Sequence, residues 1–535
     1  MKHIFQPLIY ALLIIAGIFI GIYILPAGSN QVGSLGKNNP ANKISDVINF
    51  IQDEYVDTVN QKLMVNTTIE QMLQQLDPHS AYIPAEDLEQ VNEPLKGNFE
   101  GIGIEFHLTR DTIMVVNVIP GGPSAEVGLM AGDRIVKVDA KNFTGPKITN
   151  DSVIKNLRGA GGTKVIVSVY RRSSPKLIDF TITRGKIPIY SIDAAYMADQ
   201  QTGYIRMSRF GEQTFDEYLT AFSKLKADGM QQLILDLRGN GGGFLEIAQQ
   251  ITDEFLSDGK MIVFTKGRKQ PRKDYKATGD GQFEKGKIVV LIDEGSASAS
   301  EIVAGALQDW DRATIVGRRS FGKGLVQQQA EMPDGSAIRL TVARYYTPTG
   351  RCIQKSYSDG YLEYESDILN RYNHGEFLNA DSIKYSDTTR YKTPGGKTVF
   401  GGGGIMPDVF VPLDTAGRGR YADEIYAAGL INEFCYKFVD ENRSMLKQKY
   451  PETSFVNDFK VDNYLMKEFT DYATKQGIKY DEQGYIKAET AFRNQLKALI
   501  GRQLYNNAIM YKVLQQDDKA LQKALKVINS KTAVK

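Results

Sequence analysis

The chain has 535 residues, of which 42% are hydrophobic and 24% are charged, and its formal net charge is +2. This length is too great for one hydrophobic core, and the composition argues against disorder over most of the chain, so we expect several globular domains. The nearly neutral charge gives no reason to expect nucleic acid, whose phosphates need clustered Lys and Arg. The two cysteines, Cys352 and Cys435, cannot build a disulfide framework or a CxxC zinc site, although one disulfide stays open.

Residues 1–26 are predicted to be a signal anchor that spans a membrane. Residues 8–25 form an uncharged, mostly apolar run, which is long enough to cross a bilayer, although the following LPAGS leaves cleavage as an alternative. Lys2 precedes the run, which favours a cytoplasmic start. We therefore expect anchoring in the inner (cytoplasmic) membrane with the remainder periplasmic or otherwise extracytoplasmic. Gly17 and Gly21 form a GxxxG pair, which leaves a homo-oligomer open.

The next segments are predicted to be a linker, residues 27–42, and a helical region, residues 43–97. The linker is rich in Gly, Asn, Ser and Pro, a composition typical of a flexible tether. Between Lys43 and Leu76 apolar residues recur at helical spacing, which predicts two amphipathic helices.

The rest of the chain predicts an α/β multidomain fold. Residues 98–185 contain short apolar strands with glycine-rich punctuation and helices expected at 123–129 and 150–157, which indicates a β-rich domain. In residues 186–415 strands and helices alternate, a pattern typical of an α/β sheet with crossover helices. Residues 416–535 predict a helical region without a chemical motif.

Three loops that follow apolar strands carry residues that a packed core does not require. Ligands and chemistry in α/β sheets lie at the carboxyl ends of the strands, so these loops are expected to lie together. Residues 238–243 are glycine-rich, which lets backbone N–H groups approach a ligand. Residues 294–301 place Ser298 before a helix, either as a nucleophile at the positive helix end or as a simple N-cap in a capping box. Residues 318–324 form the third loop.

The third loop nearly matches a phosphate-binding loop. Gly317, Gly322 and Lys323 fit G-x-x-x-x-G-K, but Gly324 stands where Ser or Thr would bind magnesium. The following LVQQQAEM predicts a strand, whereas a phosphate-binding loop leads into a helix. We therefore set the nucleotide hypothesis aside and expect neither a metal nor an organic cofactor.

Lys323 is the candidate base for a serine hydrolase. The four histidines are distant from these loops in sequence and no G-x-S-x-G motif occurs, although a histidine could approach in space. A free lysine has a pKa near 10.4, which must fall by roughly 3 units for a base near neutral pH. Phe321, Gly322, Gly324 and Leu325 flank Lys323 without an acid, a setting that desolvates an ammonium and offers it no counter-ion.

The sequence SASASE, followed by FGKG with Lys323 25 positions after Ser298, resembles the carboxyl-terminal processing (tail-specific) peptidases. The motifs LDPHS, YYTPTGRCIQ and GIMPDV agree with that family. The resemblance implies a serine endopeptidase that works through an acyl-enzyme, with Ser298 as nucleophile, Lys323 as its base and Gln327 orienting the lysine. It also implies an oxyanion hole made of the backbone N–H groups of Gly243 and Ala299.

The same resemblance implies that the core is crotonase/Clp-protease-like and that residues 98–185 form an inserted PDZ domain. A PDZ domain would help to select protein or peptide substrates with free C-termini, including unfolded or C-terminal segments of extracytoplasmic proteins. Backbone amides beside a strand edge suit capture of a peptide carboxylate, although a plain hairpin strand is the alternative. The residues implied for this capture are Gly101, Ile102, Gly103 and Ile104.

Residues 355–401 depart from the family pattern as a polar insertion rich in Tyr and Asp. It could be a lid, a partner site or a solvated loop, and we expect the last. The alternative function for the whole chain is a catalytically silent PDZ adaptor or holdase. The feature that argues against this alternative is that Ser298 and Lys323 are both present.

Overall fold

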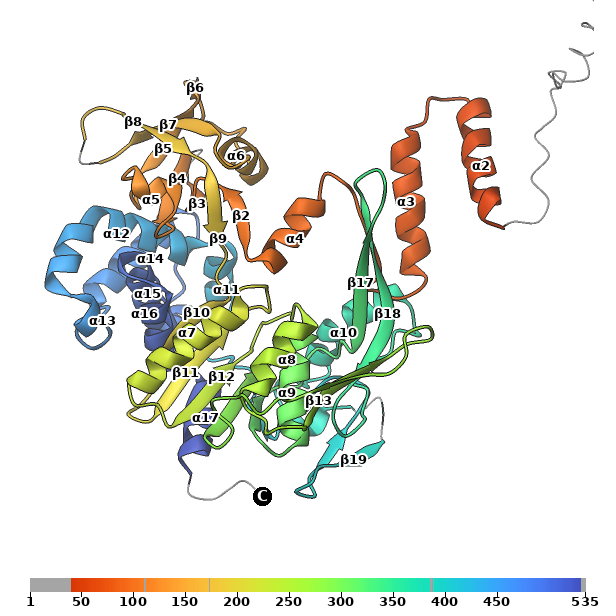
Figure 1. Ribbon diagram of the computed structural model, residues 1–535. Coiled ribbons are helices and arrows are strands. Elements are labelled where there is room, and N and C mark those ends of the chain that lie inside the picture. The colour runs from red at the N-terminus through yellow and green to blue at the C-terminus, as the bar shows by residue number, and fades with distance from the viewer. Residues whose placement is uncertain (1–39, 110–111, 173, 385–386, 388, 531–535) are drawn as a thin grey trace, which may run out of the picture. The chain divides into compact units, whose positions relative to one another are not determined.

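The computed structural model describes residues 40–109, 112–172, 174–384, 387 and 389–530 (Figure 1). One compact unit ends at Leu73, and another runs from Gln74 onward. The predicted anchor, residues 8–25, lies outside the described residues. Among the residues that are described, none of the helices combines the length and apolar character needed to cross a bilayer.

Two helices are present near the amino terminus, as predicted, although the first begins at Pro40, inside the predicted linker of residues 27–42. They are α2 (Pro40–Glu54) and α3 (Gln61–Gln74). In the following stretch the chain forms β1 (Ala81–Ile83) and α4 (Leu88–Lys96), which ends at Gly97 in the left-handed conformation that favours glycine.

The β-rich domain is built on an antiparallel sheet in the order β3-β4-β5-β7-β8, with β6 paired to β5. Alternate strand residues such as Ile113, Ile135 and Val165 are fully buried, so one face of the sheet forms the core of this domain. Its elements are β2 (Asn98–Gly101), β3 (Ile104–Thr109), β4 (Thr112–Val118), α5 (Pro123–Glu126), β5 (Arg134–Val138), β6 (Lys141–Asn142), α6 (Asn150–Leu157), β7 (Lys164–Tyr170), β8 (Ile178–Thr183) and β9 (Gly185–Pro188).

The region of alternating strands and helices holds a second sheet in the order β10-β11-β12-β15-β16-β21, which is parallel from β11 onward. The first strand, β10, runs antiparallel to β11. The elements of this part are β10 (Ile192–Met197), β11 (Thr202–Met207), α7 (Thr214–Ala227), β12 (Gln232–Asp236), α8 (Leu245–Asp253), β15 (Lys287–Ile292), α9 (Ala299–Asp309), β16 (Thr314–Gly317) and β21 (Val409–Phe410).

Both faces of this sheet are covered. On β12, Leu233 and Leu235 pack into the cluster that includes α7, α8 and α9, whereas Ile234 packs into the cluster with α17 (Lys519–Asn529) (Figure 1). Strand side chains alternate between faces, so a strand covered on both sides is apolar at successive positions, as the central residues Leu233, Ile234 and Leu235 of β12 are. The last helix of the tail therefore completes the core of the sheet.

A further sheet, in the order β1-β18-β13-β14 with β17 on β18, lies outside the parallel sheet. The predicted strand LVQQQAEM is present as β17 (Leu325–Glu331), which confirms that no helix follows the third loop. The other strands are β13 (Met261–Lys266), β14 (Lys273–Lys276) and β18 (Ala337–Tyr346).

The expectation that residues 355–401 form a solvated loop is wrong. This insertion contains α10 (Tyr361–Asn373), the 3-10 turn η1 (Ala380–Ser382) and the hairpin strands β19 (Arg390–Lys392) and β20 (Thr398–Phe400). Its polar composition suggested exposure, but several of its polar side chains are buried. They are buried because they form ion pairs and hydrogen bonds with one another and with the core. They include Tyr364, Arg371 and Glu376.

The tail is helical, as predicted, and most of it has its own apolar core, which includes Phe434, Phe469 and Phe492. Its helices before α17 are α11 (Arg420–Ala427), α12 (Leu430–Lys449), α13 (Glu452–Asp458), α14 (Asn463–Lys475), α15 (Glu482–Leu504) and α16 (Asn507–Leu514). Cys435 is buried in this core. Both Cys435 and Cys352 are free thiols, so the single disulfide that the sequence left possible does not form.

Candidate active site

The three predicted loops lie together. They follow β12, β15 and β16, which are parallel neighbours, so their carboxyl ends meet at one edge of the sheet. A cavity of about 700 Å³ opens beside them, and its wall includes Gly243, Ser298, Lys323 and Gln327. The structure thus brings these four predicted residues into one site.

Ser298 is held in a sharp turn at the start of α9. Its φ of 56° and ψ of −113° lie outside the regions that residues other than glycine usually adopt. It is the N-cap of α9, and its backbone N–H donates to the Glu301 carboxylate at 2.8 Å. Ser298 therefore caps the helix, as one of the two interpretations predicted. It also lies on the cavity wall near the positive end of the helix, so the two interpretations are compatible.

Glu301 connects the loop of Ser298 with the loop of Lys323. Its carboxylate is fully buried and also accepts hydrogen bonds from the backbone N–H groups of Gly322, at 2.8 Å, and Lys323, at 2.9 Å. The hydroxyl of Ser320 donates to it at 2.5 Å. Burial, only partly offset by these donors, raises the pKa of Glu301 to about 7. The sequence showed Glu301 only as a helix cap, because its partners come from a different loop.

Lys323 lies in the cavity wall with its amine bound to an amide. Its Nζ donates to Oε1 of Gln327 at 3.0 Å. No carboxylate in the described part of the chain forms an ion pair with it, and the charges of Asp77 and Glu301 offset the effect of burial only in part. Burial and the positive charge of Arg339 lower the pKa of Lys323 below its ordinary value. A lysine in this state can be neutral, and can accept a proton, at a lower pH than a free lysine.

A histidine does approach the site in space. The carbonyl oxygen of His79 accepts a hydrogen bond from Nε2 of Gln327, and its ring Nε2 lies 2.6 Å from the hydroxyl of Tyr364. Burial and the nearby charge of Lys323 lower the pKa of His79 to about 4, so its ring is neutral near neutral pH. The ring is bound to Tyr364, and it is the backbone of His79 that contacts the Gln327 side chain.

The LDPHS motif is explained by the buried carboxylate of Asp77. Its Oδ1 accepts hydrogen bonds from the N–H groups of His79 and Ser80, both at 2.9 Å, and from the hydroxyl of Thr341 on β18 at 3.0 Å. Its Oδ2 accepts from the hydroxyl of Ser80 at 2.6 Å. These contacts fasten the turn that presents the His79 carbonyl to Gln327. The sequence analysis identified LDPHS only as a motif shared with the family and assigned it no role.

The glycine loop lies directly against Ser298. A Cβ built on Gly242 would lie 2.8 Å from Cβ of Ser298 and 2.9 Å from the backbone N of Ala299. The N–H of Gly242 donates to Oδ1 of Asn240 at 2.9 Å, whereas the N–H of Gly243 has no acceptor among the described residues. Ala299 is the first residue of α9, where helix N–H groups lack an intrahelical acceptor. This geometry favours Gly243 over Gly242 as an oxyanion donor.

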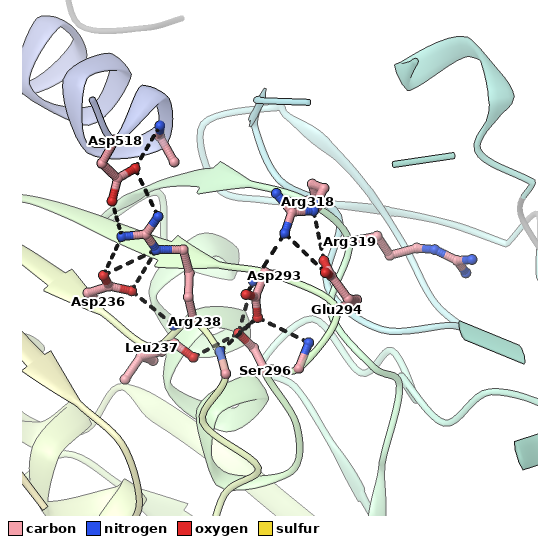
Figure 2. Close-up of polar contacts among 12 residues, drawn as sticks. Asp236, Leu237, Arg238, Asp293, Glu294, Ser296, Arg318, Arg319 and Asp518 are labelled. Carbon is pink, nitrogen blue, oxygen red and sulfur yellow. Dashed lines mark hydrogen bonds and ion pairs between the residues drawn. The ribbon is translucent and has the colours of Figure 1, made fainter. Parts of the chain in front are cut away.

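Polar contacts join the glycine loop to the loop that precedes Ser298 (Figure 2). Asp293 accepts hydrogen bonds from the N–H groups of Gly239, at 2.8 Å, and Gly295, at 3.0 Å. The hydroxyl of Ser296 donates to the carbonyl oxygen of Leu237 at 2.8 Å. These hydrogen bonds set the relative position of the two loops.

Arg238 ties the start of the glycine loop to the tail helix α17 (Figure 2). Its guanidinium binds the fully buried carboxylate of Asp236 at 2.6 Å and that of Asp518, the N-cap of α17, at 2.7 Å. Burial alone would raise the pKa of Asp236, but Arg238 and the neighbouring donors lower it to about 2. The arginine is thus held between the carboxylates of Asp236 and Asp518.

In the β-rich domain the predicted peptide loop joins β2 to β3. Ile102 is buried in the domain core, and Gly103 has a φ of 78°, where a Cβ would lie 2.9 Å from Ile187. Strand β3 pairs with β4, and no other described strand pairs with its second edge. The backbone of Gly101 to Ile104 therefore leads into a strand edge to which a peptide could add.

Known protein families match three parts of the chain. Residues 201–361 match peptidase family S41, residues 101–182 match a PDZ domain, and residues 421–506 match a family of unknown function. The carboxy-terminal-processing protease of Bartonella bacilliformis is 39% identical over 353 residues, which are 64% of this chain and 79% of that protein. This chain belongs to the carboxy-terminal-processing proteases of family S41.

Other members of the family are also similar. A probable CtpA-like serine protease of Staphylococcus aureus is 34% identical over 65% of this chain and 69% of that protein. The carboxy-terminal processing protease CtpB of Bacillus subtilis is 32% identical over 64% of this chain and 72% of its own length. The present carboxy-terminal-processing protease is therefore a serine peptidase with a PDZ domain, as SASASE and FGKG indicated.

Proposed function

We propose that Ser298 and Lys323 form the catalytic pair of this protease. The observation that carries the proposal is the partly buried amine of Lys323, which shares a cavity with Ser298, is bound to Gln327 and has no carboxylate in an ion pair among the described residues. Burial without a counter-ion is the arrangement that makes a lysine a base, because it disfavours the ammonium form.

The proposed reaction has two stages, formation of an acyl-enzyme and its hydrolysis. Oγ of Ser298 attacks the peptide carbonyl carbon while Nζ of neutral Lys323 takes the hydroxyl proton, and the N–H groups of Gly243 and Ala299 hold the resulting oxyanion. The C–N bond then breaks as Lys323 returns the proton to the leaving amine, which yields an acyl-enzyme. Water then attacks the ester carbonyl carbon while Lys323 takes a proton from it. As the bond to Oγ breaks, Lys323 gives that proton to Oγ, which releases the carboxylic acid and restores the Ser298 hydroxyl. Gln327 keeps the lysine amine in place throughout.

Activity is expected to rise with pH on the acid side of its profile. Below the pKa of Lys323 the amine is protonated and cannot act as a base, so cleavage increases as pH rises through that pKa, which lies below the ordinary lysine value. Protonation of Glu301, whose pKa is about 7, would weaken its contacts with both loops and acts in the same direction. The measurement is kcat/KM against pH with an unfolded protein substrate. An activity that falls as pH rises through this range would rule out lysine as base.

We also propose that the PDZ domain captures the free carboxyl terminus of the substrate at Gly101 to Ile104. Support comes from the PDZ match and from the available edge of β3. Amidation of a substrate removes the terminal charge, so we expect slower cleavage well below saturation and a smaller difference at saturation, where local concentration no longer matters. The measurement compares free-acid and amidated versions of one unfolded substrate. Equal rates at low substrate would contradict carboxylate capture and leave the Ser298/Lys323 chemistry standing.

We further propose that residues 8–25 anchor the protease in the cytoplasmic membrane with its catalytic part extracytoplasmic. The support is the uncharged apolar run after Lys2 in the sequence. Alkaline extraction of membranes tests this proposal, because a spanning anchor stays with the lipid and a peripheral protein is released.

A further inference from the structure

The insertion, residues 355–401, is packed against the loop that carries Lys323. The buried guanidinium of Arg371 donates to the backbone carbonyl oxygens of Arg319, at 2.8 Å, and Ser320, at 3.1 Å. The buried carboxylate of Glu376 binds both Arg319, at 2.6 Å, and Arg371, at 2.8 Å. Removing buried charged groups from water is costly unless they are paired, so these contacts form a specific junction between the insertion and the lysine loop.

Tyr364, on α10 of the insertion, is held at this junction. Its side chain is 3% exposed. The amine of Lys355 lies 3.9 Å from the centroid of the Tyr364 ring and 4.1 Å from that of Phe321, and it donates to the Tyr364 carbonyl oxygen at 3.1 Å. Asp367 pairs with the same amine at 3.1 Å. The position of the Tyr364 ring relative to the FGKG loop is therefore defined from several directions.

A chain of hydrogen bonds runs from Tyr364 to the proposed base. The Tyr364 hydroxyl lies 2.6 Å from Nε2 of His79, whose carbonyl oxygen accepts from the amide nitrogen of Gln327. The amide oxygen of Gln327 then accepts from Nζ of Lys323 at 3.0 Å. A glutamine amide can present either its donor or its acceptor end. Its contact with the His79 carbonyl determines that the acceptor end faces the lysine.

We propose that Tyr364 is a positioning residue for Lys323, acting through His79 and Gln327. The hydroxyl of Tyr364 fixes the His79 ring, and Asp77 fixes the His79 backbone, so that the carbonyl oxygen stays directed at the Gln327 amide. The insertion thereby becomes part of the apparatus that orients the base. The inference deepens the proposed function and rests on it.

The first test compares Tyr364→Phe with Tyr361→Phe on the same helix. Tyr361 is 41% exposed, so the control makes the same chemical change at the surface. Tyr364→Phe is expected to lower kcat roughly three- to tenfold, the rate equivalent of losing one hydrogen bond, with KM and the unfolding midpoint close to wild type. Tyr361→Phe should retain wild-type kcat. A Tyr364→Phe variant with wild-type kcat would overturn the inference.

The second test places Tyr364→Phe in a Gln327→Ala background and measures single-turnover cleavage with enzyme in excess, so that slow variants remain measurable. If Tyr364 acts through Gln327, the second substitution has no further effect once the amide is gone. If the two losses multiply, Tyr364 acts by another route and the inference is wrong. Ser298→Ala serves as the separate reference: cleavage by that variant would overturn the proposed function itself, whatever Tyr364 does.

Discussion

Ser298→Ala and Lys323→Ala are each expected to abolish proteolysis, with a fall in kcat on the order of 10⁴-fold or more. The alanine at 298 leaves no hydroxyl to form the acyl-enzyme, and the alanine at 323 leaves no amine to take the proton. Both groups act in the same step, so the double variant should be no slower than either single variant. The measurement is the cleavage of an unfolded protein by each purified variant, with circular dichroism to show that the fold is retained.

Ser300→Ala is the matched control for these two variants. The Ser300 hydroxyl is buried and donates to the carbonyl oxygen of Asn240 at 2.8 Å, so its loss is expected to cost about 1 kcal/mol of unfolding free energy and leave most of the activity. Proteolysis at the wild-type rate by Lys323→Ala would end the proposal of a serine and lysine pair. Loss of activity in Ser300→Ala to the same extent as in Ser298→Ala would show that the assay reports folding.

Gly243→Ala is expected to lower kcat about 10²- to 10³-fold, the size of effect that follows loss of one oxyanion donor. Gly243 has a φ of 149°, and a Cβ there would lie 2.1 Å from the carbonyl oxygen of Phe210. Because that neighbour is backbone, the methyl group can be accepted only if the loop moves, and the N–H of Gly243 moves with it. The measurement is kcat with a substrate at saturation, accompanied by the unfolding midpoint.

Gly241→Ala tests whether the effect belongs to this position. Gly241 lies in the same loop, but no atom lies within 4 Å of a Cβ placed there, and its φ is outside the left-handed region. We expect it to keep kcat within about threefold of wild type, as substitutions away from special sites usually do. If Gly243→Ala were equally active, the proposed oxyanion donor would be wrong, since the structure leaves no room for that methyl group without displacement.

The parts of the site that could be predicted from sequence are those in which the chemistry is local. Each loop follows its own apolar strand, so the positions of Ser298 and Lys323 at one sheet edge follow from parallel strand order alone. The glycine run and the capping position of Ser298 are also visible without coordinates. Gln327 was assigned by resemblance, and the structure places its amide oxygen against the lysine amine.

The insertion shows where composition misleads. Its charged and aromatic residues predicted a solvated loop, because isolated charges avoid the interior. Arg371 and Glu376 are nevertheless buried, since they pair with each other. Glu376 also pairs with Arg319 from a loop more than fifty positions earlier, and Arg371 donates to the carbonyl oxygen of Arg319. A pairing of this kind leaves no periodic pattern in the sequence, so only the folded chain reveals it.

The sequence by itself determined the α/β core, a β-rich domain, the strand β17 after the third loop and the nucleophile and base candidates, because hydrophobic periodicity and motif spacing are properties of neighbouring residues. The family resemblance, and not the periodicity, identified the β-rich domain as a PDZ domain. Only the tertiary structure decided which groups surround Lys323. His79 lies 248 positions from its partner Gln327, and Tyr364 lies 285 positions from His79. Arg238 likewise meets Asp518 across 280 positions. Contacts over such separations depend on how whole elements pack, and local residue preferences carry no record of them.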